Sequence, residues 1–136
     1  MYLVRVLVLS LVSTISWAQT PPQKAEAFLA QLSAGETDQA LDKVFAGSGM
    51  AELKPQAVMA MKSQVKVALG VYGKAIGFEK IDEVEFSPSL KRVTYLQKFE
   101  LYPVIWEMYF YRAKDSWVLS NILFNDQLAV ALGAKQ

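Results

Sequence analysis

Residues 104–112 read VIWEMYFYR and have the pattern of a buried β-strand. This segment is rich in β-branched and aromatic residues, and successive side chains of a strand point to opposite faces of a sheet. One face would carry only large apolar groups, namely Val104, Trp106, Met108 and Phe110. The other would carry Ile105, Glu107, Tyr109 and Tyr111. We therefore predict a strand whose first set of side chains lies in the core.

Similar segments on either side extend this strand into a sheet. Period-two patterns predict four strands, over residues 76–86, 90–101, 104–112 and 117–125. The intervening loops are short enough to join antiparallel neighbours, so we predict an antiparallel meander. If no bulge intervenes, the inner face continues on the second strand with Val93, Tyr95, Gln97, Phe99 and Leu101. On the fourth strand it continues with Trp117, Leu119, Asn121 and Leu123.

The chain before this sheet has helical periodicity. Apolar residues at spacings of three and four predict three helices, with prolines opening the first and third and glycines ending each. The expected helices run from Pro21 to Gly35, from Thr37 as the capping residue to Gly47, and from Pro55 to Gly73. Residues 128–132 are expected to add a final helical turn or to lie over the sheet edge.

The outer face of the predicted sheet is unusually apolar for a surface in water. An antiparallel sheet with one solvated face alternates more cleanly than this one, and so large an exposed patch is normally covered. We expect a homodimer through the sheet, with a different partner or a C-terminal segment folding back as alternatives. The interface candidates are Leu96, Ile105, Tyr109, Tyr111, Ile122 and Phe124, with Val118 beside them.

The first eighteen residues predict where the protein works. A short positive start ends at Arg5, residues 3–15 are almost wholly apolar, and small residues precede Gln19. This pattern is typical of a secretory signal peptide cleaved after Ala18, which leaves residues 19–136 as a single periplasmic domain. The apolar run is shorter than the roughly 20 residues of a membrane-spanning helix. No stable membrane anchor is expected after cleavage, and a retained anchor is the alternative.

Composition excludes several kinds of chemistry. The chain contains no Cys and no His, which removes thiol and histidine catalysis, disulfides, and metal sites built from these residues. Export without disulfides suits a Gram-negative periplasm. The formal net charge is only +1, and Arg5 accounts for it, so nothing favours nucleic acid as a partner. We expect no metal and no cofactor.

The order of these elements resembles a known superfamily. The chain has FLAQL at residues 28–32, a glycine at 35, DQAL at 38–41, a long helix, and SWVL opening the last strand at 116–119. It resembles the nuclear-transport-factor-two-like superfamily. The resemblance implies a cone-shaped, cystatin-like α+β domain with helices in the hollow of a curved sheet and an apolar pocket between them. Members range from ketosteroid-isomerase-like enzymes to noncatalytic domains, so the fold does not fix the function.

Candidate site residues follow from the predicted inner face. The enzymatic members place Asp, His or Tyr on the pocket wall, and here the available phenols are Tyr72 and Tyr95. The carboxylates of Glu83, Glu85, Glu107 and Asp126 are interpreted as solvated surface charges. A mostly apolar pocket with a few polar groups is typical of small-molecule sites. The candidate ligand-binding residues are Tyr72, Tyr95, Gln97, Trp106, Met108 and Asn121, with Phe110 in the wall.

The sequence therefore favours an exported noncatalytic domain that binds a small apolar ligand between helices and sheet. The competing interpretation of the same residues is a filled core, in which the buried polar groups bond to the protein itself. A second function is a protein interaction or dimerisation module acting through the outer sheet face. A ketosteroid-isomerase-like enzyme is the least favoured.

Overall fold

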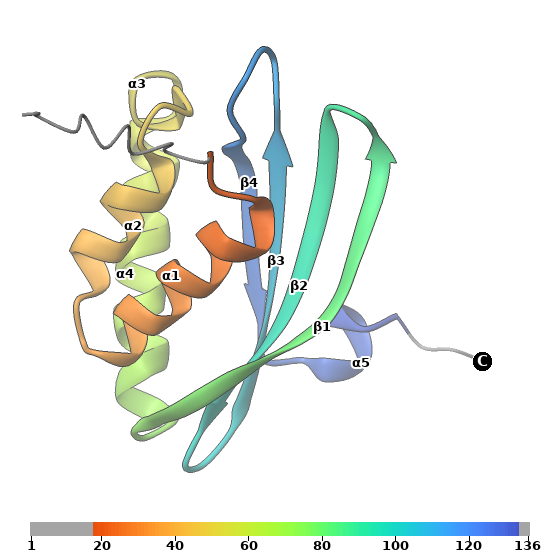
Figure 1. The fold of residues 1–136 in the computed structure, drawn as a ribbon. Coiled ribbons are helices and arrows are strands. Elements are labelled where there is room, and N and C mark those ends of the chain that lie inside the picture. The colour runs from red at the N-terminus through yellow and green to blue at the C-terminus, as the bar shows by residue number, and fades with distance from the viewer. Residues whose placement is uncertain (1–17, 134–136) are drawn as a thin grey trace, which may run out of the picture.

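The computed structural model describes residues 18–133, so the predicted signal peptide lies outside the described residues apart from Ala18. The protein is α+β, with helices followed by an antiparallel sheet and one last helical turn (Figure 1). Its helices are α1 (Pro21–Ser33), α2 (Thr37–Phe45), α3 (Met50–Leu53), α4 (Pro55–Val71) and α5 (Leu128–Ala131). Its strands are β1 (Ala75–Ser87), β2 (Leu90–Phe99), β3 (Pro103–Tyr111) and β4 (Val118–Asn125).

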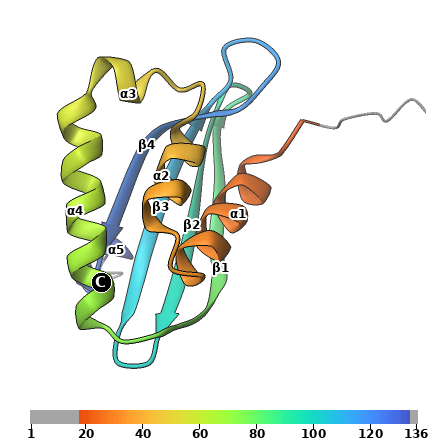
Figure 2. The same cartoon turned by 90° about the vertical axis from the view of Figure 1, so that its left-hand side faces the viewer.

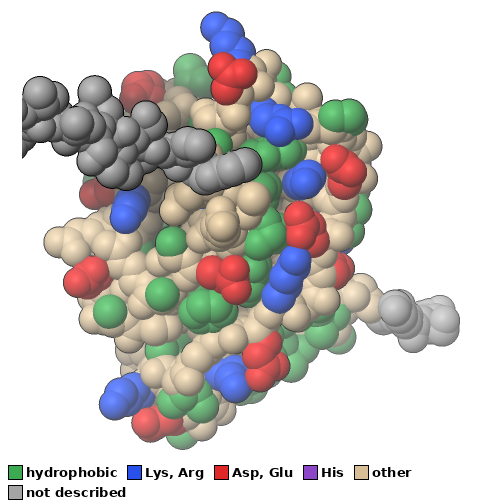
Figure 3. All heavy atoms as spheres, in the orientation of Figure 1, with side chains coloured by type: hydrophobic (Ala, Val, Ile, Leu, Met, Phe, Trp, Pro, Cys, Tyr) green, Lys and Arg blue, Asp and Glu red, His purple; other side chains and the backbone are tan. Residues whose placement is uncertain are grey.

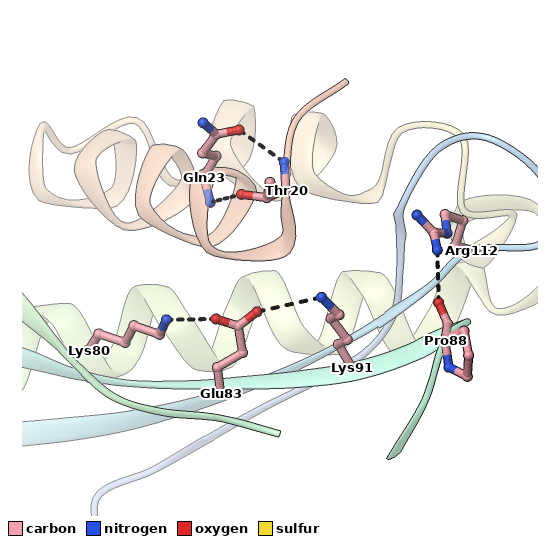
Figure 4. Close-up of polar contacts among 7 residues, drawn as sticks. All are labelled: Thr20, Gln23, Lys80, Glu83, Pro88, Lys91 and Arg112. Atoms are coloured by element: carbon pink, nitrogen blue, oxygen red, sulfur yellow. Dashed lines mark hydrogen bonds and ion pairs between the residues drawn. The ribbon is translucent and has the colours of Figure 1, made fainter. Parts of the chain in front are cut away.

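Four helices, rather than the three predicted, precede the sheet. α1 opens with a capping box, in which the Thr20 side chain accepts from the Gln23 amide at 3.4 Å and the Gln23 side chain accepts from the Thr20 amide at 3.0 Å (Figure 4). The additional helix α3 begins after Gly49, whose φ of 72° suits glycine. Thr37 is not a capping residue, because it is already helical and Glu36 occupies the N-cap position.

The sheet is a curved antiparallel meander in the order β1-β2-β3-β4, as predicted (Figure 2). Both β1 and β4 are edge strands. β2 ends at Phe99, two residues earlier than expected. Leu101 therefore lies beyond the strand and is exposed, so its predicted place on the inner face is wrong.

Helices α1, α2 and α4 lie on one face of the sheet, which we call the inner face, and α5 lies on the outer face (Figures 1 and 2). The Trp106 ring packs edge-to-face against Phe28, with ring centroids 5.2 Å apart. Its indole N–H donates to the Gln97 side-chain oxygen at 2.8 Å. The other members of the predicted inner set on β3 are buried in the same core, namely Val104, Met108 and Phe110.

A bulge in β4 changes which of its side chains face the core. Tyr109 pairs with Asn121 and Phe110 pairs with Leu119, so Ser120 is an extra residue on β4. One extra residue moves the following side chains to the opposite face. The Ser120 hydroxyl donates to the Tyr109 carbonyl at 3.2 Å, and the Asn121 side chain accepts from the Ile122 amide at 2.9 Å.

Four predicted orientations on β4 are therefore wrong. Asn121 and Leu123 were expected on the inner face and are exposed on the outer one. Ile122 and Phe124 were expected on the outer face, but Ile122 is buried in the core and Phe124 packs against it. The prediction assumed a regular strand, and the bulge reverses the alternation after residue 120.

The outer face is partly covered by the end of the chain. Ile105 is only 1% exposed, although its neighbours on β3 point into the inner core. α5 packs against β3 and β4 on this side, so a C-terminal segment folds back as one alternative anticipated. Tyr111 stays exposed, while Leu96 and Tyr109 are half-buried. None of the described helices is long and apolar enough to cross a membrane.

Charged side chains gather at the β1 edge of the sheet. Acidic and basic groups alternate over the part of the surface that β1 and β2 occupy (Figure 3). Glu83 illustrates the pattern, since its carboxylate lies 2.7 Å from the Lys80 ammonium and 3.9 Å from that of Lys91 (Figure 4). Arg112 donates to the Pro88 carbonyl at 3.0 Å beyond this row. The interpretation of Glu83 as a surface charge agrees with these pairs.

Candidate functional site

The predicted ligand-binding residues of the sheet are mostly packed into the interior. Tyr95, Gln97, Trp106 and Met108 are each no more than 1% exposed. They line none of the four principal hollows of the described surface. The Gln97 side-chain oxygen is used by Trp106, although its Nε2 has no partner among the described residues. Here the interior has the character of a filled core.

Tyr95 is the phenol buried most deeply in this core. Its hydroxyl lies 3.5 Å from the Pro22 carbonyl, the limit of a hydrogen bond. Burial is the main cause that raises the pKa of Tyr95 to about 12, with the carboxylates of Glu26 and Glu83 contributing. The phenol is therefore neutral at physiological pH and is not poised for proton transfer.

A groove between α4 and β4 is the best candidate binding site. It holds about 400 Å³ and is lined by Ser63, Gln64, Val67, Ala68, Val71 and Tyr72 from the α4 side and by Phe124 from β4. We call it the α4–β4 groove. Tyr72 is the one predicted ligand-binding residue in its wall, whereas Phe124 was expected in a dimer interface.

The groove exists because α4 buries little of its surface. This helix begins at Pro55 and runs for 17 residues, yet only Val58 and Val65 are fully buried. Val67 is 69% exposed and Val71 is also largely exposed. Covering an apolar side chain that is so exposed to water lowers the free energy of the protein. The helix therefore presents a ready apolar wall beside the edge strand.

A polar pair closes one end of the groove. Tyr72 caps the C-terminus of α4, and its hydroxyl donates to the Asp126 carboxylate just after β4. The hydrogen bond to Asp126 is the main cause that raises the pKa of Tyr72. The Tyr72 ring also stacks on Tyr102, with centroids 5.7 Å apart, and lies 5.9 Å from the Phe99 ring. Several contacts thus fix its orientation.

Sequence reasoning missed Asp126 and interpreted it as a solvated charge. The two partners lie 54 residues apart, so no local motif connects them. Only the topology, which returns the end of β4 to the end of α4, brings them together. The nearest available signal was the position of each residue at the end of its element.

The groove offers mainly apolar contacts, because its walls are mostly apolar. The phenol at its end is neutral at physiological pH, as an ordinary tyrosine is, and the hydrogen bond to Asp126 raises its pKa further. No three acidic residues of the described chain, residues 18–133, converge as metal ligands would. No family model, no curated protein and no solved structure matches this chain.

Proposed function

We propose that this chain is an exported, noncatalytic binding domain that takes a small apolar ligand in the α4–β4 groove. Export to the periplasm through residues 1–18 and cleavage after Ala18 belong to the proposal. The absence of cysteine fits that location. The arrangement of three helices on one face of a curved four-stranded sheet supports a cone-shaped, cystatin-like member of the nuclear-transport-factor-two-like superfamily.

One observation carries the proposed function. The α4–β4 groove combines exposed aliphatic groups with two aromatic rings and has few polar groups. Its volume of about 400 Å³ lies in the range of small-molecule sites, roughly 300–1,000 Å³. Ser63 and Gln64, with the Tyr72 hydroxyl oxygen as an acceptor, supply the few polar groups that orient a ligand in such sites.

A ketosteroid-isomerase-like activity is supported less well. It would need a carboxylate base facing the ligand and donors that hold an oxyanion. Asp126 is engaged by the Tyr72 hydroxyl, and that hydroxyl is thereby used as a donor within the protein. Tyr95, the other phenol considered, is fully buried.

The test of the groove is a titration with N-phenyl-1-naphthylamine, whose fluorescence rises in apolar surroundings. We compare the wild type with Val67→Glu, which places a charge in the groove wall. Because the carboxylate must lose water when the probe binds, we expect at least a tenfold loss of affinity. Met59→Glu is the matched control, since Met59 lies on the same helix and is 68% exposed, against 69% for Val67. Equal affinities in the two variants would contradict the groove as the site.

Native mass spectrometry tests the export part of the proposal independently. Protein exported by its own leader and purified without detergent should have a mass that begins at Gln19. A small-molecule adduct lost on activation would identify the ligand. A mass that includes residues 1–18 would instead indicate a retained anchor.

Self-association is a second candidate, and one observation favours it. β4 is an edge strand, yet VLSNILFN contains no charged side chain, whereas edge strands are usually protected by charges. Its neighbouring outer surface retains Leu123, Tyr109 and Tyr111. The test is the mass in solution of Tyr109→Lys with Leu123→Lys, which should be monomeric if the wild type is a dimer. A monomeric wild type would refute this candidate.

A further inference from the structure

A second hollow lies on the outer face, away from the α4–β4 groove. It holds about 660 Å³ between the sheet and α5. Asp82, Arg92, Thr94 and Glu107 from the first three strands form its polar side, and Ile81 and Leu132 contribute apolar walls. We call it the outer hollow. It shares no residue with the groove of the proposed function.

Three oxygen-bearing side chains form a row across the strands. Asp82 pairs with Thr94 on β2, and Thr94 pairs with Glu107 on β3. Directly opposed residues of antiparallel strands project on the same face, with Cβ atoms about 4.5–5.5 Å apart. A hydroxyl is thus flanked by two carboxylates within one site.

The middle member of the row has an unusual environment. Thr94 is only 3% exposed, and its Oγ1 has no hydrogen-bond partner among the described residues. Buried polar side-chain atoms are nearly always hydrogen-bonded, so such a group in a native protein calls for an explanation. Its position in the wall of a hollow suggests a partner supplied from outside the protein.

The charges around the row are not balanced. Arg92 is directed to Asp82, with its nearest terminal nitrogen 3.7 Å from the carboxylate, and its guanidinium lies 5.8 Å from the Phe86 ring. No lysine or arginine within residues 18–133 pairs with Glu107. Glu107 is half-buried, so its negative charge is the one left for an incoming cation.

We propose that the outer hollow binds an aliphatic primary ammonium group. The ammonium would donate to the Glu107 carboxylate and to Thr94 Oγ1, and the carbon chain would lie against Ile81 and Leu132. A primary ammonium carries three donors and no acceptor, which suits a row of oxygens. The apolar α5 side then favours an alkyl chain over a small inorganic cation.

The test is a calorimetric titration of the full chain with n-pentylamine and, as a matched neutral probe, 1-pentanol. We expect the wild type to bind the amine and not the alcohol. Glu107→Gln keeps the shape and removes the charge, and Thr94→Val keeps the shape and removes the hydroxyl. Hydrogen bonds to charged groups are stronger than those between neutral groups. We therefore expect Glu107→Gln to weaken amine binding about tenfold and Thr94→Val to weaken it severalfold.

Glu85→Gln is the control, since Glu85 is an exposed carboxylate on β1 that does not line the outer hollow. Equal losses in Glu85→Gln and Glu107→Gln, or binding of both probes alike, would overturn the proposal. Should Glu107→Gln not fold, the comparison of Thr94→Val with wild type still decides it. A parallel titration with Nα-acetyl-lysine methylamide distinguishes a free amine from a lysine side chain of a polypeptide as the natural source.

Discussion

The two faces of the sheet are built from the same strands and yet are covered very differently. On the inner face, α1, α2 and α4 enclose large side chains such as Trp106 and Phe110 completely. On the outer face, the single turn of α5 packs against β3 and β4, where Ile105 is buried, and a hollow lies between α5 and the sheet. The inner face is thus covered by packed helices, whereas the outer face is only partly covered and contains a hollow.

The difference also extends to polar groups. In the inner core the buried Trp106 indole donates to the Gln97 side-chain oxygen, and Gln97 Nε2 is the one buried polar side-chain atom there without a partner among the described residues. On the outer face, Arg92 Nε and Thr94 Oγ1 are both buried without a partner among the described residues, and both residues line the outer hollow. A site for ligands is more readily found where the cover is thin and polar atoms are unused than inside a filled core.

The largest expected effect tests which side chains of β4 face inward. Ile122→Lys would bury an unpaired ammonium in the inner core and should destabilise the protein by about 4 kcal/mol or more. Leu123→Lys, one residue later, places the same charge on a side chain that is 47% exposed, and should change stability by no more than about 0.5 kcal/mol. Urea unfolding measures both. The opposite ranking would mean that β4 has no bulge at Ser120.

The next prediction compares how tightly side chains are packed on the two faces of the sheet. Trp106→Ala removes the largest fully buried side chain of the inner core and leaves the Gln97 oxygen unpaired, so a loss of about 4 kcal/mol is expected. Ile105→Ala removes a residue that is just as buried on the outer face. There a single helical turn has freedom to settle into the space, and we expect about 2 kcal/mol.

Urea unfolding measures both losses of stability. If the dependence of the unfolding free energy on urea concentration is unchanged, the shift of each midpoint gives the loss directly. If Ile105→Ala cost as much as Trp106→Ala, the cover provided by α5 would be as rigid as the inner core. The contrast between the faces would then not hold.

The sequence was sufficient to predict the sheet because its information is local. Alternation in residues 104–112 identifies the buried side of β3 without reference to any neighbour, and short loops dictate antiparallel pairing. The bulge at Ser120 could not be found in this way. It is defined by how β4 pairs with β3, so a regular pattern and a bulged one look alike until the partner is known.

The candidate site was predicted less well for a related reason. Tyr72 lines the α4–β4 groove, but the prediction placed it in a pocket between helices and sheet, a space that core side chains fill. The volumes of Trp106, Phe28 and their neighbours decide whether such a space stays open, and periodicity carries no information on volume. Likewise, the Tyr72 to Asp126 contact depends on where two distant elements end.

The smallest effect concerns how well the inner core excludes charge at high pH. The pKa of Tyr95 is raised to about 12 in the folded protein, against about 10 in an unfolded chain. Above pH 10 the unfolded chain releases this proton while the folded protein keeps it, so stability falls as the pH rises from about 10 to 12. At pH 11 the loss from this group should be about 1 kcal/mol.

Tyr95→Phe removes only this contribution, so the difference in unfolding free energy between wild type and variant should shift by that amount between pH 9 and 11. A constant difference would mean that water reaches Tyr95 and that the inner face is less closed than its packing implies.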